Sequence, residues 1–228
     1  MLKYGESSLI LTVLTRNNGK IIGSIKNALN KNNISIYQLG NSLNLNVYAR
    51  LEEGLYTIHA DLLKANAVNF MFDEKKLYAL SSLCELCNAC LPEKENIESF
   101  YNVIEDFFNH INEEEWLSYY SYFEFYLLEY LGVGLDLSEC AVTGQKRDLK
   151  YVSPKSGKAV SAEAGAPYAE RLFAYPEYIL QKNYHPKLQE VDNLLKMTEF
   201  FLNKNFFRQH GLKFPQNRAN LRNKMLNL

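Results

Sequence analysis

The chain has 228 residues, of which 47% are hydrophobic and 22% are charged, and its formal net charge is −1. This length and hydrophobic content support a sizeable core in one large or two small domains, which excludes a disordered chain. The sequence has neither a secretory signal pattern nor the roughly 18 consecutive apolar residues of a membrane span, so we expect a soluble, cytoplasmic protein.

The first third of the chain is predicted to be β-structure. Residues 9–15 and 20–26 are extended segments joined by a turn at 16–19, a pattern typical of a hairpin. Apolar and polar residues alternate over 43–48, and an extended segment over 55–63 follows. Short strands at this spacing predict a small closed barrel, which we assign to a first domain, 1–70.

From about residue 68 the apolar residues recur with the period of a helix, so a second, helical domain is predicted over 71–228. Within it, residues 132–166 are glycine-containing and lack a helical period. We expect a looped insert there, with one hairpin around 151–160, and a basic C-terminal tail. The fold class is therefore α+β, with helices expected over 74–91, 97–112, 116–131 and 188–209.

The four cysteines do not predict a metal site. Cys84, Cys87 and Cys90 lie within a helical period, where they cannot all face one metal, so we interpret them as reduced core residues. Cys140 occupies one position of what would be a tetracysteine knuckle, and zinc needs the other three. We expect no cofactor, and an insert held by its turns and by the packing of Leu149, Tyr151 and Val160.

The sequence contains no catalytic constellation. Its four histidines are scattered, and it has no glycine-rich phosphate loop and no hydrolase or metalloprotease motif. We expect that the protein is not an enzyme. The charge instead divides along the chain: residues 1–72 carry a net +3, residues 92–139 hold twelve acids and one base, and residues after 200 hold six bases and no acid. Two basic ends favour a nucleic-acid partner.

An ordered set of short motifs resembles the RecO family of bacterial recombination mediators. The motifs run along nearly the whole chain: Tyr4-Gly-Glu-Ser-Ser, Leu14-Thr15 before Gly19-Lys20, Gln38 with Gly40-Asn41, Leu91-Pro-Glu, Leu131-Gly-Val-Gly-Leu-Asp-Leu, Cys140-Ala-Val-Thr-Gly and Tyr151-Val-Ser-Pro-Lys-Ser-Gly. The resemblance implies an OB-type barrel that binds single- and double-stranded DNA, a helical domain and no active site. It also implies annealing of complementary strands, action with RecR to load RecA, and contact with the C-terminal tail of single-strand-binding protein (SSB).

The sequence departs from the family pattern in three places. The family begins about a dozen residues earlier, with a strand before the Tyr4-Gly-Glu motif, so two alternatives are open: the start of the chain is misassigned, or the barrel is open and lacks its first strand. The basic stretch after the hairpin has Asn27 and Leu29 where further bases are usual. Three of the four zinc positions found in some members are Thr143, Val160 and Glu163, as in the branch without metal.

Because annealing needs phosphate contacts more than base reading, we expect lysine and arginine to carry the function. Tyr37 or Tyr48 could add a stacked base. An adaptor that binds proteins without binding DNA, and a nuclease, are the alternatives. The candidate phosphate contacts are Arg16, Lys20, Lys26, Lys31, Arg50, Arg218, Arg222 and Lys224, and the candidate contacts to the SSB tail are Arg171, Lys204 and Arg208.

Overall fold

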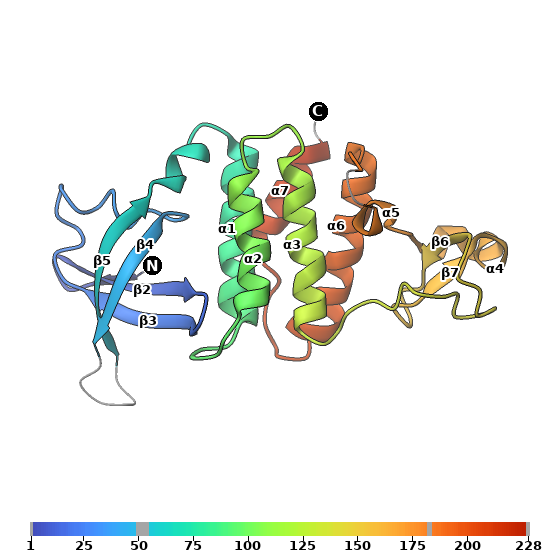
Figure 1. The fold of residues 1–228 in the computed structure, drawn as a ribbon, viewed down its shortest axis with the longest axis horizontal. Coiled ribbons are helices and arrows are strands. Elements are labelled where there is room, and N and C mark those ends of the chain that lie inside the picture. The colour runs from blue at the N-terminus through green and yellow to red at the C-terminus, as the bar shows by residue number, and fades with distance from the viewer. Residues whose placement is uncertain (1, 49–54, 182–183, 227–228) are drawn as a thin grey trace. The chain divides into compact units, whose positions relative to one another are not determined.

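The structure is a computed structural model that describes residues 2–48, 55–181 and 184–226 (Figure 1). They form two compact units, one of residues 1–101 with 215–228 and the other of residues 102–214. The end of the chain thus belongs to the same unit as its beginning. The domain division at residue 70 stays a prediction from sequence.

The first unit contains a five-stranded sheet of order β1-β2-β3-β5-β4, in which only the β3–β5 pair is parallel. The hairpin and the two later strands were predicted, and the structure confirms them. Where the sequence left open that the first strand is missing, the structure has a three-residue strand, β1, which ends at Tyr4, directly before the turn at residues 5–7. β1 and β4 are not paired within the described residues, so the OB-type barrel stays a prediction. The strands are β1 (Leu2–Tyr4), β2 (Ser8–Thr15), β3 (Gly19–Ile25), β4 (Ser42–Tyr48) and β5 (Tyr56–Lys64).

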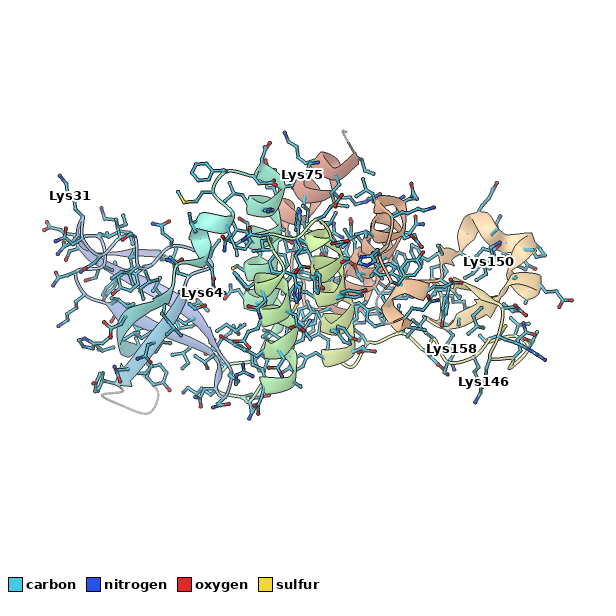
Figure 2. All side chains as sticks on the ribbon, turned by 45° about the horizontal axis from the view of Figure 1, so that its top comes forward. Lys31, Lys64, Lys75, Lys146, Lys150 and Lys158 are labelled. Atoms are coloured by element: carbon cyan, nitrogen blue, oxygen red, sulfur yellow. The ribbon has the colours of Figure 1, made fainter. Side chains whose placement is uncertain are left out.

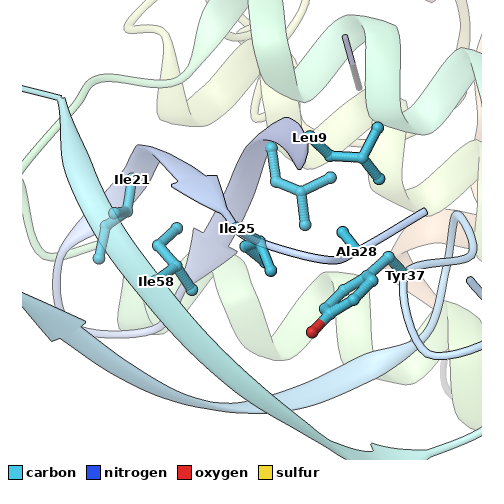
Figure 3. Packing of buried hydrophobic residues seen from close by; sticks show 7 residues of the cluster. Leu9, Ile21, Ile25, Ala28, Tyr37 and Ile58 are labelled. Atoms are coloured by element: carbon cyan, nitrogen blue, oxygen red, sulfur yellow. The ribbon is translucent and has the colours of Figure 1, made fainter. Parts of the chain in front are cut away.

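The core of the sheet also fixes the long loop between β3 and β4, residues 26–41. Alternate residues of β3 point inward, so Ile21 and Ile25 pack with Ile58 of β5 (Figure 3). Ala28 and Tyr37 come from the loop and are buried in the same cluster. Burial of these two residues holds the loop against the sheet, and its polar residues remain outside.

Helices complete the first unit. The 3₁₀ turn η1 (Asn66–Asn69) leads to α1 (Glu74–Cys90). The Asp73 carboxylate caps the first turn of α1, because it accepts hydrogen bonds from the N–H groups of Lys75 and Lys76. Helix α2 (Glu98–Asn109) follows; its first turn belongs to this unit, and its residues from 102 onward belong to the second unit. The segment predicted as a basic tail forms a helix, α7 (Gln216–Leu226), that lies beside α1 (Figure 1).

The second unit pairs α3 (Trp116–Tyr130) with α6 (Leu188–Leu202), which continues into a π-turn at Asn203–Phe207. Its insert holds a sheet of order β7-β6-β8, and the β6–β7 pair confirms the predicted hairpin. An N-terminal sheet followed by a helical part confirms the α+β class. The insert was predicted over 132–166, but its sheet includes β8, so from here on the term covers residues 132–180. Its elements are β6 (Leu149–Val152), β7 (Ala159–Ser161), α4 (Ala162–Gly165), η2 (Ala166–Arg171), β8 (Phe173–Ala174) and α5 (Glu177–Leu180).

Among the described residues, no helix combines the length and the apolar character needed to cross a bilayer.

Candidate nucleic-acid interface

The turn of the β2–β3 hairpin is fixed to the segment between α1 and α2. The Lys20 N–H donates to the Pro92 carbonyl at 3.1 Å, and the Ile97 N–H donates to the Arg16 carbonyl at 3.1 Å. Gly19 has φ +54°, and a Cβ at this position would lie 2.7 Å from the Pro92 carbonyl oxygen. Only glycine fits this approach, which holds the turn against the helical segment.

The two predicted cations of this turn make contacts within the protein. The Lys20 Nζ donates at 2.6 Å to the carbonyl of Asn88, which lies in the last turn of α1, where the helix dipole favours a cation. The Arg16 guanidinium lies over the Tyr101 ring, 5.0 Å from its centroid. Both side chains are only half-exposed. They stabilise the docked turn and present less charge to a phosphate than the sequence suggests.

Two other predicted cations, Lys26 and Lys31, lie in the loop at 26–41. Both side chains are exposed, and Figure 2 shows Lys31 projecting from this loop. Neither has an ion pair among the described residues. The loop backbone is held in place, since the Leu29 N–H donates to the Ser7 carbonyl at 3.0 Å and the Asn33 amide donates to the Asn27 carbonyl at 3.0 Å. These lysines are therefore exposed on an ordered backbone.

Sequence reasoning missed two lysines that border the same loop. Lys64, labelled in Figure 2, pairs in register with Ser42, directly after the loop. Lys3 of β1 pairs with Leu9, which pairs with Ile25, the last residue of β3, so Lys3 lies two strands, about 10 Å, from the loop entry. Both lysines are exposed. We call Lys3, Lys26, Lys31 and Lys64 the loop lysines.

The loop lysines and the hairpin cations do not form one continuous track. The strand pairing places Thr15 opposite Gly19 at one end of the hairpin and Leu9 opposite Ile25 at the other. Six residues of strand separate the two ends by about 20 Å. Arg50 falls between β4 and β5, outside the described residues.

The predicted C-terminal cations lie on α7. Arg218 is fully buried, and because a guanidinium without exposed surface cannot contact a phosphate, we remove it from the candidate set. Lys224 pairs with Glu74 of α1 at 2.7 Å, and this hydrogen bond raises the pKa of Lys224 above its usual value. Arg222 is half-buried. In this structure α7 contributes packing more than accessible charge.

The three cations predicted to bind the SSB tail all belong to the second unit. Lys204 donates to the carbonyls of Pro154 and Lys155, at 2.9 and 3.3 Å, so it is already bonded to the insert. Arg171 ends η2, and Arg208 follows the π-turn; both are exposed. No described contact brings the three together.

Tyr37 and Tyr48, the two candidate stacking residues, have different surroundings. Tyr37 is only 8% exposed and belongs to the sheet core, so it serves packing. Tyr48 is 58% exposed at the end of β4, where its ring meets that of His59 edge-on, with 5.6 Å between centroids. Tyr48 therefore stays available as a stacking surface.

The prediction that the cysteines of α1 are core residues is confirmed for Cys87 and Cys90. Cys87 and Cys90 are buried and Cys84 is half-buried. Burial raises the pKa of Cys84 and of Cys90 to about 12 and that of Cys87 well above its usual value, so these thiols stay protonated at neutral pH. The described residues contain no group of three or more histidine, cysteine or acidic side chains placed to hold a metal ion.

Hydrogen bonds tie Cys140 to β7 of the insert. Its sulfur accepts the Ser161 N–H at 3.2 Å and lies 3.5 Å from the Ser161 hydroxyl. Burial alone would raise the pKa of Cys140, but bonds from Ser161 and Thr143 outweigh burial and lower the pKa to about 6. Val160 is buried beside this contact, whereas Leu149 and Tyr151 are half-buried. Protein donors thus surround the sulfur.

Comparison with known proteins gives a family for both parts of the chain. The family model "Recombination protein O N terminal" matches residues 1–66, and "Recombination protein O C terminal" matches residues 71–213. The DNA repair protein RecO of Wolbachia sp. subsp. Drosophila simulans is 38% identical over 235 residues, which cover 99% of this chain and 95% of that protein. The RecO protein of Rickettsia canadensis is 36% identical, over 90% of this chain and 85% of that protein. The RecO protein of Bartonella quintana is also 36% identical, over 96% of this chain and 90% of that protein.

Proposed function

Since this chain belongs to the RecO family, and so to the proteins of DNA repair and recombination, we propose that it is a recombination mediator that binds DNA through the loop lysines. It binds single- and double-stranded DNA and anneals complementary strands. It acts without breaking bonds, in the bacterial cytoplasm, where it joins the nucleoid during repair.

The observation that carries this proposal is the exposure of Lys26 and Lys31 on an anchored loop, with no ion pair among the described residues. Ammonium groups neutralise phosphates without reading base edges, and this leaves the bases available for pairing with a second strand. Neutralisation also lowers the repulsion between two strands that approach each other. Annealing follows from these two effects.

The proposal includes protein partners. With RecR, the protein helps RecA to replace SSB on single strands, and it contacts the acidic C-terminal tail of SSB. Arg171 and Arg208 are the exposed candidates for that tail, because guanidinium groups form strong paired hydrogen bonds with carboxylates. Lys204 is the weaker candidate, since its ammonium already bonds to the insert.

The test is binding of a fluorescent single-stranded oligonucleotide, followed by anisotropy over a salt series. The double variant Lys26→Gln/Lys31→Gln should lower the slope of log K against log salt by about 0.7 for each lysine that meets a phosphate. Lys187→Gln is the matched control, because Lys187 is exposed and lies at the start of α6 in the second unit. Its slope should equal that of the unchanged protein.

An unchanged slope in the double variant would remove the loop from the DNA-binding site. Absence of binding at low salt in the unchanged protein would favour the alternative, an adaptor that joins proteins without touching DNA. Cleavage of the oligonucleotide by chelator-treated protein would favour a nuclease.

A further inference from the structure

A second group of exposed cations lies in the insert, away from the two basic ends of the chain. Lys146, Arg147 and Lys150 lie before and within β6, and all three are exposed. Figure 2 labels Lys146 and Lys150 on the insert. None of the three has an ion pair among the residues that the structure describes. Their charge is therefore available to a ligand.

The backbone that carries these cations is fixed by local hydrogen bonds. The Cys140 N–H donates to the backbone carbonyl of Gln145 at 2.8 Å. The side-chain amide of Gln145 donates to the backbone carbonyl of Arg147 at 3.2 Å. The Ala162 N–H donates to the carbonyl of Asp148 at 2.8 Å. A ligand that binds here orders side chains but not backbone, which lowers the entropy cost of binding.

The positive charge continues past the other end of β6. Residues 144–158 contain five bases and one acid. Lys155 is exposed, whereas Lys158 pairs with Asp136 at 3.2 Å. The four residues of β6 extend over about 13 Å, so cations border both ends of this strand. A ligand with repeated negative charges matches this spacing better than a single carboxylate does.

A shallow pocket of about 210 Å³ lies beside the first of these cations. Leu149, Tyr175 and Leu180 are among its lining residues, and the Tyr175 hydroxyl is held by a 2.9 Å bond to the Leu137 carbonyl. Lys146 and Arg147 line the pocket on the cationic side. Asp148 and Glu177 line it as well, so the pocket offers both donors and acceptors and no net charge.

We propose that this face of the insert is a second contact for single-stranded DNA, with a base in the pocket and phosphates on Lys146, Arg147 and Lys150. A base is neutral and carries donors and acceptors beside an apolar face, as the pocket requires. An acidic protein segment fits less well, because its carboxylates would meet Asp148 and Glu177. This inference rests on the proposed DNA binding and adds a second site to it.

The first measurement uses the full chain and the double variant Lys146→Gln/Arg147→Gln. Its slope of log K against log salt should be lower than that of the unchanged protein by about 1.4, since each lost phosphate contact removes about 0.7. Lys187→Gln again serves as the control. A thermal melt of each variant confirms folding, which these exposed positions should not alter.

The second measurement locates the strand by photocrosslinking to an oligonucleotide that contains 4-thiothymidine. We expect crosslinked peptides that contain Tyr175 or Leu180, and a several-fold lower yield at these residues in the double variant. Crosslinks confined to the first unit, together with an unchanged salt slope, would overturn the inference.

The two double variants distinguish the insert site from the loop lysines. If no form of the protein binds DNA, both fall. If Lys26→Gln/Lys31→Gln weakens binding while Lys146→Gln/Arg147→Gln does not, the insert site alone falls. If the insert variant binds DNA normally but loses binding of a hexaglutamate peptide, the surface is a protein site and the inference is wrong.

Discussion

Gly19 decides whether the hairpin can dock on the segment between α1 and α2. Its φ is positive, a backbone conformation that residues other than glycine rarely adopt. An added Cβ would lie 2.7 Å from the Pro92 carbonyl oxygen and 2.9 Å from the Glu95 carbonyl oxygen. Both atoms belong to backbone, which cannot move aside cheaply. Gly5 offers a comparison, because its φ is +67° but nothing lies within 4 Å of the added atom.

We predict that Gly5→Ala lowers the free energy of unfolding by about 1 to 2 kcal/mol, the cost of a left-handed conformation alone. Gly19→Ala should cost more, because it adds the clash with the Pro92 and Glu95 carbonyls to that strain. Urea unfolding of the two variants measures the difference. Equal losses would mean that the close approach at Gly19 does not contribute to stability.

The sequence identified candidate cations but could not indicate which of them make contacts within the protein. Lys20 bonds to Asn88, which lies 68 positions away, and Arg16 lies over Tyr101. Contacts of such separation leave no local pattern in the sequence. Lys26 and Lys31 could be assigned to the loop after β3 from sequence, because they follow a recognisable strand. Lys3 and Lys64 lie within strands, and their position near this loop becomes clear only from the strand register.

Helix α6 and its π-turn hold the insert through Lys204. Its ammonium bonds to two carbonyls of the turn after β6 and lies 5.6 Å from the centroid of the Phe200 ring. Within that turn, the Gly157 N–H donates to the Ser153 carbonyl at 2.8 Å. The lysine predicted to bind a partner therefore positions the insert.

We predict that Lys204→Gln speeds hydrogen exchange of the Ser153 and Gly157 amides several-fold and leaves the α6 amides unchanged. The physical reason is the loss of charged donors to the turn, each of which forms a stronger bond than a neutral donor does. Arg208→Gln is the control, since Arg208 is exposed and makes no described bond to the insert. Equal exchange in the two variants would contradict this role.

The elements that sequence predicted are those with a clear apolar period. The hairpin, β4, β5 and the four long helices all follow from alternation or from helical spacing. Helix α7 was not predicted from sequence. Its buried residues are Arg218, Leu221 and Met225, which follow one another at the helical spacing of three and four. An arginine in a buried position interrupts the apolar stripe that would have revealed the helix.

The chain as a whole has a net charge of −1, yet both units carry exposed cations. The first unit carries the loop lysines and the second carries the insert cations. Composition alone could not indicate this division, because the acids between 92 and 139 cancel the bases in the total. We infer the role in DNA repair and recombination from the ordered motifs and from the relatives, because charge and fold alone do not identify a repair pathway.

In the proposed function, these lysines and arginines promote pairing of complementary strands by holding phosphates. Its most direct test is the annealing rate of two complementary oligonucleotides labelled for energy transfer, with the unchanged protein and with the combined variant at Lys26, Lys31, Lys146 and Arg147, each replaced by Gln. We expect faster annealing with the unchanged protein, loss of most of that acceleration in the variant, and intact strands throughout. Acceleration that survives all four substitutions, or strands that are cut, would contradict it.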